Sequence, residues 1–193
     1  CQEWKAQYKL RYDNSGDSIK PQYVLEMIND ITKGNAILVT DVGQHQMWAA
    51  QYFKPSQARS FITSGGLGTM GFGFPASLGA KVGCPDREVI SITGDGSFQM
   101  TIQELATIRL YNIGVKIVII NNGYLGMVRQ WQELFFESRF SHTHIGEFNP
   151  DFAKLASEGY GIPARTLTKK EELKDGLDFL FNTDGPALLN VVV

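Results

Sequence analysis

Residues 88–97 read Glu88-Val89-Ile90-Ser91-Ile92-Thr93-Gly94-Asp95-Gly96-Ser97, an apolar run that ends in an aspartate between two glycines. The run is short, rich in β-branched residues and closed by glycine, which predicts a buried strand over 88–93. Apolar residues then recur at helical spacing, which predicts a helix over 97–111 that Ser97 opens. A buried strand followed by a helix is the repeating unit of an α/β sheet.

Asp95 lies between the end of that strand and the start of the helix. The free N–H groups of a helix N-terminus favour anions such as phosphate, but a carboxylate beside a phosphate is repulsive unless a cation lies between them. The arrangement therefore indicates Mg²⁺ bridging Asp95 and a phosphate. Taken alone, the motif is also compatible with a plain Asp–Gly turn followed by a serine cap.

Asn121-Asn122 ends the next apolar run, and 24 residues lie between Gly96 and Asn121. That gap is the length of one helix plus one strand, so we expect both motifs at the same edge of the sheet. An amide oxygen is a hard ligand that suits Mg²⁺. Asn122-Gly123 alone would indicate no more than a turn, but the pair of motifs at this spacing favours a metal site.

The rest of the chain alternates in the same way. We predict a doubly wound α/β domain with a mainly parallel six-stranded sheet and helices on both faces, whose ligands lie beyond the carboxyl ends of the strands. The first helix begins near Ser18 as its cap. The expected strands span 36–40, 60–63, 88–93, 115–120, 164–167 and 187–193, and the expected helices span 18–34, 44–53, 74–82, 97–111, 124–137, 152–158 and 169–181.

The composition is that of an ordinary globular domain. The 193 residues are 43% hydrophobic and 20% charged, with a net charge of −2, which argues against a nucleic-acid groove or a polybasic membrane surface. No apolar run approaches the roughly 18 residues of a transmembrane helix. Two cysteines, Cys1 and Cys84, argue against a disulfide framework and favour a reducing compartment. Many of the 20 glycines fall between Gly65 and Gly96, where we expect backbone to approach a ligand or a neighbouring chain.

Two further patterns carry weaker alternatives. Residues 66–71 match G-x-G-x-x-G, but they come well after the first strand, and Glu88 opens a strand instead of closing one, so an NAD site is disfavoured. His142 and His144 stand two residues apart without a third ligand nearby, a poor zinc motif, and we interpret them as structural or hydrogen-bonded.

The Gly94-Asp95-Gly96 and Asn121-Asn122 pair resembles the thiamine-diphosphate-binding motif of thiamine-dependent enzymes. Four other segments resemble the large catalytic subunit of the acetohydroxyacid synthase (acetolactate synthase) family, namely residues 44–48, 63–71, 126–131 and 141–144. The resemblance spans residues 18–193 and implies the C-terminal, diphosphate-binding domain of that subunit. Residues 1–17 are then expected to be a lead-in from a preceding domain.

The resemblance implies roles for individual residues. Asp95, Asn122 and the carbonyl of Tyr124 would bind the metal. Met70 would support the cofactor in its bent form, and Met127 and Trp131 would line the substrate pocket, although both methionines and Trp131 also suit core packing or an amphipathic helix. The cofactor-binding set implied is Gln44, His45, Gly68, Met70, Gly94, Asp95, Gly96, Ser97, Asn122, Tyr124, Gly126 and Met127.

The family's activity gives the expected function: two pyruvates condense to 2-acetolactate and CO₂, or pyruvate and 2-ketobutyrate to 2-aceto-2-hydroxybutyrate, in branched-chain amino-acid biosynthesis. Thiamine diphosphate and Mg²⁺ are the implied cofactors here. The catalytic glutamate belongs to a pyrimidine-binding domain, and FAD binds a further domain; neither domain is in this chain, so we expect a fragment of a longer chain that is inactive alone. A trimmed mature protein is the alternative.

The family also implies a homodimer or higher oligomer, a possible small regulatory subunit, no nucleic acid and no membrane. The expected location is cytoplasmic in a bacterium and organellar in a eukaryote. The rival hypotheses are another thiamine-diphosphate enzyme (a pyruvate oxidase, glyoxylate carboligase or 2-keto acid decarboxylase), a non-catalytic nucleotide-binding module and an interaction domain.

Overall fold

The computed structural model describes residues 2–8 and 10–193. Within them lies a six-stranded sheet in the order β2-β1-β3-β4-β6-β5, and every pair of neighbours is parallel. The strands are β1 (Ile37–Thr40), β2 (Phe61–Thr63), β3 (Val89–Gly94), β4 (Val115–Asn121), β5 (Ala164–Leu167) and β6 (Ala187–Val192). The six predicted strands are thus confirmed, and the sheet is wholly parallel.

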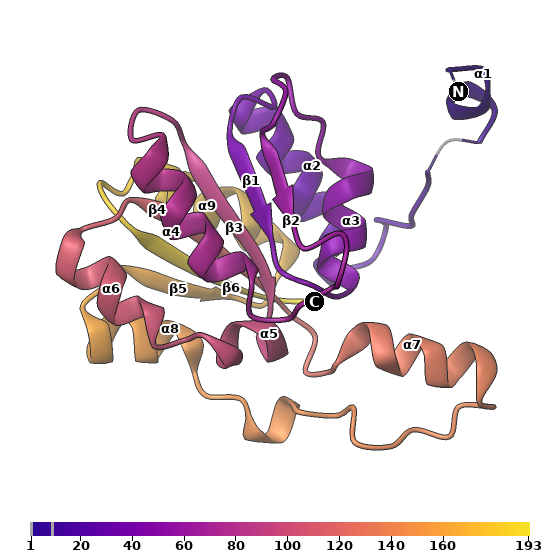
Figure 1. Ribbon diagram of the computed structural model, residues 1–193. Coiled ribbons are helices and arrows are strands. Elements are labelled where there is room, and N and C mark those ends of the chain that lie inside the picture. The colour runs from indigo at the N-terminus through magenta and orange to yellow at the C-terminus, as the bar shows by residue number, and fades with distance from the viewer. Residues whose placement is uncertain (1, 9) are drawn as a thin grey trace.

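Helices cover both faces of the sheet, which confirms the doubly wound architecture (Figure 1). One face is covered by α2 (Pro21–Thr32), α3 (Gln44–Tyr52) and α9 (Leu173–Asn182). The other is covered by α4 (Gly73–Gly83), α5 (Asp95–Met100), α6 (Glu104–Tyr111) and α8 (Phe152–Lys154). The strand order reverses between β1 and β3, because β2 lies on the far side of β1. Ligands of such sheets bind at that point.

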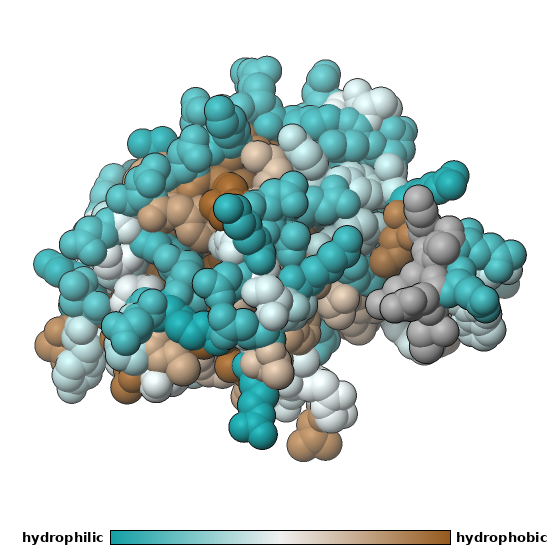
Figure 2. All heavy atoms as spheres, turned by 90° about the horizontal axis from the view of Figure 1, so that it is seen from above, coloured by the Kyte–Doolittle hydropathy of each residue, from teal (hydrophilic) through white to brown (hydrophobic). Residues whose placement is uncertain are grey.

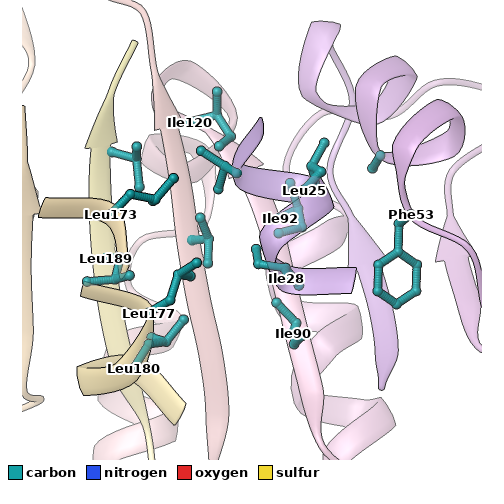
Figure 3. Packing of buried hydrophobic residues seen from close by; sticks show 14 of the residues in the cluster. Leu25, Ile28, Phe53, Ile90, Ile92, Ile120, Leu173, Leu177, Leu180 and Leu189 are labelled. Atoms are coloured by element: carbon teal, nitrogen blue, oxygen red, sulfur yellow. The ribbon is translucent and has the colours of Figure 1, made fainter. Parts of the chain in front are cut away.

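Alternating strand residues supply the two cores. On the first face, Leu25 and Ile28 of α2 pack over the part of β3 that carries Ile90 and Ile92 (Figure 3). The leucines of α9 cover the other half of the sheet, where Leu189 lies (Figure 3). On the second face, the rings of Phe74 in α4, Phe98 in α5 and Phe152 in α8 stack in series, with centroids 4.9 and 5.8 Å apart. The sheet is therefore buried on both sides, as continuous apolar strands require.

Three predicted helices differ from the structure. The first begins at Pro21, with Lys20 and not Ser18 at the N-cap, because proline at the first helical position presets the backbone angle. The helix predicted over 97–111 is two helices, α5 and α6, whose inward residues are buried as the periodicity indicated. Beyond α8, the chain winds into a π-helical turn, Leu155–Gly159, where an α-helix was expected to continue.

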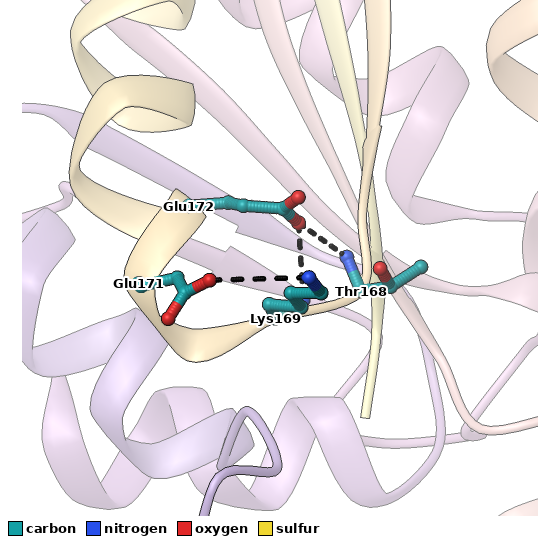
Figure 4. Close-up of polar contacts among 4 residues, drawn as sticks. All are labelled: Thr168, Lys169, Glu171 and Glu172. Carbon is teal, nitrogen blue, oxygen red and sulfur yellow. Dashed lines mark hydrogen bonds and ion pairs between the residues drawn. The ribbon is translucent and has the colours of Figure 1, made fainter.

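The connection from β5 to α9 begins with a 3-10 turn, Lys170–Glu172. The Glu172 carboxylate accepts hydrogen bonds from the N–H groups of Thr168 and Lys169, at 2.9 and 3.0 Å, which satisfies donors that the first turn leaves free (Figure 4). These bonds also lower the pKa of Glu172. The Lys169–Glu171 ion pair beside them is exposed and contributes little.

Residues 1–17 were expected to be a lead-in from a preceding domain. The structure has a short helix there, α1 (Gln2–Gln7), and Cys1 lies outside the described residues. Tyr12 reaches the domain itself, with its hydroxyl bonded to the Glu26 carboxylate and its ring edge-on to Tyr52 at 5.5 Å. The last part of the lead-in therefore packs against α2 and α3.

One helix stands apart from the sheet. From β4, α7 (Gly126–Phe135) extends away from the body, and residues 136–150 return alongside it (Figure 1). Each residue of α7, all of which the structure describes, is at least partly exposed, although its apolar side chains lie at helical spacing. We call residues 123–149 the arm.

The opposite end of the sheet, where the strands begin, is largely covered by hydrophilic side chains (Figure 2). Among the described helices, none is long and apolar enough to cross a membrane.

Candidate functional site

A pocket lies at the carboxyl ends of β1, β3 and β4, at the reversal of strand order. Four segments that are distant in sequence meet there: the start of α3, the loop of residues 64–72, the turn from β3 into α5, and the turn from β4 into α7. The pocket brings together eleven residues that the sequence singled out, namely Gln44, His45, Met70, Gly94, Asp95, Gly96, Ser97, Asn122, Tyr124, Gly126 and Met127.

Two other predicted residues lie outside this pocket's lining. Gly68 is exposed in the glycine-rich loop, residues 64–72 between β2 and α4, and the nearest atom to a Cβ built on it is Cγ1 of Val42, 3.8 Å away. Trp131 lies further along α7, is 57% exposed and stacks on Phe135 with ring centroids 4.9 Å apart. In this chain, Trp131 therefore faces solvent on the arm.

Asp95 is the charged centre of the pocket. Its side chain is 1% exposed, and burial raises its pKa, although hydrogen bonds from Asn149 and from the main chain of Gly96 and Gly123 act against this. An ionised carboxylate in such a place needs compensation by a cation or by donors. Asp95 thus suits a metal that arrives with its own anionic ligand.

Asn122, which follows the last residue of β4, lines the same pocket as Asp95. Its Oδ1 accepts a hydrogen bond from the N–H of Tyr124 at 3.0 Å, and its Nδ2 donates to Oε1 of Gln44 at 3.3 Å. Gln44 in turn donates to Gln130 of α7 at 3.1 Å. The amide of Asn122 therefore has a fixed orientation, with its oxygen turned toward the main chain of Tyr124.

Two glycines of the pocket lie directly against neighbouring side chains. A Cβ on Gly126 would lie 2.2 Å from Oε1 of Gln44, and one on Gly96 would lie 2.8 Å from Cδ2 of Leu125. Both distances are shorter than a non-bonded contact allows. Both atoms lie at the ends of side chains, so a methyl group at either position would displace Gln44 or Leu125.

His45 is buried beside Gly94, where a Cβ would lie 2.9 Å from Nδ1 of His45. Desolvation lowers its pKa to about 4, against the opposing effects of the Asp41 charge and a hydrogen bond to the main chain of Asp41. Its Nε2 is buried and has no hydrogen-bond partner among the described residues. A neutral imidazole with one unsatisfied nitrogen lining a pocket is suited to a polar ligand group.

Asp41 is a functional position that the sequence marked only as a strand end. Its buried carboxylate accepts hydrogen bonds from the N–H groups of Val42 at 2.8 Å, Gly71 at 2.9 Å and Gly73 at 2.7 Å. It thereby ties the end of β1 to the glycine-rich loop that carries Met70. Loop-to-strand bonds across 30 residues leave no local signal in the sequence.

The histidines of the arm are involved in local contacts. His142 lies 2.7 Å from the Ser141 hydroxyl through Nδ1, and the His144 ring stacks on Tyr124 with centroids 4.8 Å apart. Across the described residues, no group of three or more His, Cys, Asp or Glu side chains is placed to hold a metal. A cation at this site would thus rely on Asp95, the Asn122 amide, a main-chain oxygen and oxygens of a ligand.

Fold and pocket together are those of an α/β domain with a polar pocket at the strand ends, where ligands of such sheets bind. The comparison with known families is specific: residues 41–191 match the thiamine pyrophosphate enzyme C-terminal TPP binding domain. The chain belongs to this family of domains (thiamine pyrophosphate is thiamine diphosphate).

Individual relatives are acetolactate synthases. The chain is 47% identical over 99% of its length to acetolactate synthase 1, chloroplastic, of Nicotiana tabacum, and covers 29% of that protein. It is 46% identical over its whole length to acetolactate synthase isozyme 2 large subunit of Escherichia coli (strain K12), and covers 35% of it. The chain thus spans about a third of the length of the relatives it matches.

Proposed function

We propose that this chain is the diphosphate- and metal-binding domain of an acetolactate synthase large subunit. The whole enzyme condenses two pyruvates to 2-acetolactate and CO₂, or pyruvate and 2-ketobutyrate to 2-aceto-2-hydroxybutyrate. The observation that carries this proposal is the convergence of Asp95, Asn122 and the Tyr124 main chain on one pocket at the switch point of the sheet. The similarity to acetolactate synthases over the whole chain supports it.

The residues present fit such a cofactor. The Asp95 carboxylate, the Asn122 Oδ1 and the Tyr124 carbonyl form the set that would hold Mg²⁺, with diphosphate oxygens completing its coordination. The buried Nε2 of His45, which has no partner among the described residues, and the amide of Gln44 would face the diphosphate. Glycine at 126 lets Gln44 and the Asn122 amide lie against the start of α7, where a Cβ would be 2.2 Å from Oε1 of Gln44.

Thiamine diphosphate, when bound, supplies an electron sink for the decarboxylation of a 2-keto acid. This chain's part is to bind and orient it. Ser97 is fixed by its hydroxyl's bond to the Val42 carbonyl at 3.0 Å, and Asp41 fixes the loop on which Met70 would support the cofactor's bent form. Met127 and Trp131 on the arm would contact the second 2-keto acid.

We further propose that the site is completed by other domains. The catalytic glutamate would come from a pyrimidine-binding domain of a partner subunit, which implies a homodimer or a larger oligomer, with FAD on another domain and possible control by a small subunit. Location would follow the source, in the cytoplasm of a bacterium or an organelle of a eukaryote.

A domain exchange tests this function. The corresponding third of the E. coli isozyme 2 large subunit is replaced by this chain, and the chimera is supplied with pyruvate, thiamine diphosphate, Mg²⁺ and FAD. We expect 2-acetolactate, and none from the same chimera with Asp95→Ala. Acetaldehyde, acetyl phosphate or tartronate semialdehyde as the main product, the last with glyoxylate as substrate, would favour another thiamine enzyme. Steady acetolactate formation by the 193-residue chain alone would contradict the need for other domains.

A further inference from the structure

Asn149 reaches the candidate metal site from a distant part of the chain. It follows the 3-10 turn Gly146–Phe148, and its Nδ2 donates to Oδ2 of Asp95 at 2.7 Å. Its own Oδ1 accepts a hydrogen bond from Nε2 of Gln99 at 2.7 Å. Because Gln99 engages the oxygen end of the amide, the donor end is turned toward Asp95.

The hydrogen bond matters because Asp95 is buried. A carboxylate that is 1% exposed has little water to hold its orientation, so its rotation depends on the donors around it. Asn149 donates to Asp95 from its side chain, and it comes from the far end of the arm, whereas the main-chain donors to Asp95 belong to the turns after β3 and β4. Residues that hydrogen-bond a metal ligand orient it and tune the affinity of the site.

The arm begins and ends at this same place. At its start, the carbonyl of Gly123 accepts hydrogen bonds from the N–H groups of Ile145 at 2.8 Å and Gly146 at 2.9 Å, and Leu125 donates to the carbonyl of Thr143 at 2.8 Å. At its end, Asn149 contacts Asp95. The two ends of the segment that carries Met127 and Trp131 are therefore joined beside the proposed metal ligands.

We propose that Asn149 is a positioning residue that holds the Asp95 carboxylate in the orientation that binds the cation, and that it thereby couples the arm to occupancy of the site. This inference rests on the proposed function. It predicts that loss of the Asn149 donor lowers metal affinity without unfolding the chain, and that Gln99 affects metal affinity only through Asn149.

The test measures metal affinity, not turnover. Mn²⁺ is titrated, with thiamine diphosphate, into the chimera described above, which supplies the other domains of the site. Its binding is followed by the enhancement of water proton relaxation, which a macromolecular complex gives and the cofactor alone does not. Variants are Asn149→Leu, Gln99→Leu and the double variant. Glu147→Gln, an exposed residue of the same turn, is the matched control. Far-UV circular dichroism and thermal unfolding without metal report on the fold.

We expect Asn149→Leu to lower the affinity for Mn²⁺ by about 10- to 100-fold, the usual effect of removing a residue that hydrogen-bonds a metal ligand. Gln99→Leu should weaken it by a few-fold, the double variant should match Asn149→Leu, and Glu147→Gln should bind like the wild type. Mn²⁺ and cofactor should slow amide exchange at residues 143–146 in the wild type and not in Asn149→Leu.

Three outcomes overturn the inference. Wild-type affinity in a folded Asn149→Leu would show that Asp95 is oriented without Asn149. Additive losses in the double variant would show that Gln99 acts separately. If Asn149→Leu does not fold, wild-type affinity in Gln99→Leu also contradicts the inference. Absence of enhancement in the chimera that carries the wild-type chain would instead contradict the proposed function itself, and the inference with it.

Discussion

The amide of Asn122 donates a hydrogen bond to Oε1 of Gln44 at 3.3 Å, although 78 positions separate the two residues. The bond joins the strand end after β4 to the start of the helix after β1. Gly126 lies directly against this pair, since a Cβ there would be 2.2 Å from Oε1 of Gln44 and 2.7 Å from Nδ2 of Asn122. The orientation of the Asn122 oxygen therefore depends on a residue that has no side chain.

Gly126→Ala is expected to displace Gln44 and turn the Asn122 amide, because neither distance allows a methyl group. Cofactor and metal affinity should fall by at least about tenfold, the scale on which metal sites respond to lost outer-sphere partners. Calorimetry with thiamine diphosphate and Mg²⁺ measures this. Gly79→Ala is the matched control, because a Cβ there meets no atom within 4 Å. Equal affinity in both variants would contradict the prediction.

Asp95→Asn is expected to abolish stabilisation by the cofactor. A ligand at about 100 times its Kd stabilises the native state by about 2.7 kcal/mol, which Mg²⁺ with thiamine diphosphate should give to the wild type and not to the variant. Thermal unfolding with and without both ligands measures it. Thiamine diphosphate in a buffer that contains EDTA and no Mg²⁺ serves as the metal-free control. A ligand-induced shift that survives in the variant would remove Asp95 from the metal site.

The metal-free chain gives a second readout of Asp95. Burial raises its pKa, so the native state binds the proton more tightly than the unfolded state. Stability of the metal-free chain should therefore fall as pH rises from the ordinary aspartate pKa, about 4, through the raised value. Asp95→Asn removes that loss. Denaturant unfolding between pH 4 and 8 should show a flatter profile for the variant, and parallel profiles would contradict this account.

His45 titrates with the opposite consequence. Its pKa in the native state is about 4, against about 6.5 in an unfolded chain, because burial disfavours the imidazolium. The unfolded chain therefore gains a proton first as pH falls from 6.5 to 4, and this destabilises the native state by up to roughly 3 kcal/mol. Above pH 6.5 the term vanishes.

His45→Gln measures that term, because glutamine does not titrate. As pH falls from 6.5 to 4, the wild type should lose up to roughly 3 kcal/mol of unfolding free energy relative to the variant. From pH 7 to 8 the difference between the two should stay constant. Urea unfolding at fixed pH values provides the numbers. A difference that does not vary with pH would mean that His45 is accessible to protons in the native state.

Sequence periodicity predicted most of the fold, because most of the strands are apolar runs closed by a turn and helices such as α2 and α9 have one apolar face. Local patterns also placed Asp95 and Asn122 together, since 24 residues is the length of one helix–strand unit. The break between α5 and α6 was missed because the apolar residues keep their spacing across it. The same holds for Leu155–Gly159, whose π-helical turn keeps Ala156 buried.

The partners of the site residues were harder to predict. Asp41 bonds to a loop 30 residues later, and Asn149 bonds to Asp95 across 54 residues. Such contacts depend on where separate elements meet, and no period or spacing within either segment records them. Trp131 illustrates the converse: its helical spacing indicated an apolar face, but the structure leaves that face open.

Asp41→Asn is expected to loosen the glycine-rich loop. An amide has one oxygen, so at least one of the three main-chain N–H groups that Asp41 binds would face an NH₂ group. Leaving such a buried donor unsatisfied costs about 1–3 kcal/mol. Amide exchange of Gly71 and Gly73 should accelerate accordingly. Asp86→Asn, at an exposed position, should change stability by less than about 0.5 kcal/mol. Unchanged exchange in Asp41→Asn would exclude this role.

Trp131→Ala is expected to leave the fold nearly unchanged despite the size of the side chain. Trp131 is 57% exposed and contacts Phe135 on its own helix, so its removal should cost less than about 1 kcal/mol. Phe98→Ala, in the stack between Phe74 and Phe152, should cost about 3–5 kcal/mol because it opens a cavity in the core. Urea unfolding of both variants compares them. A loss of several kcal/mol in Trp131→Ala would show that the arm belongs to the folding core. A small loss would agree with an apolar face of α7 that serves binding.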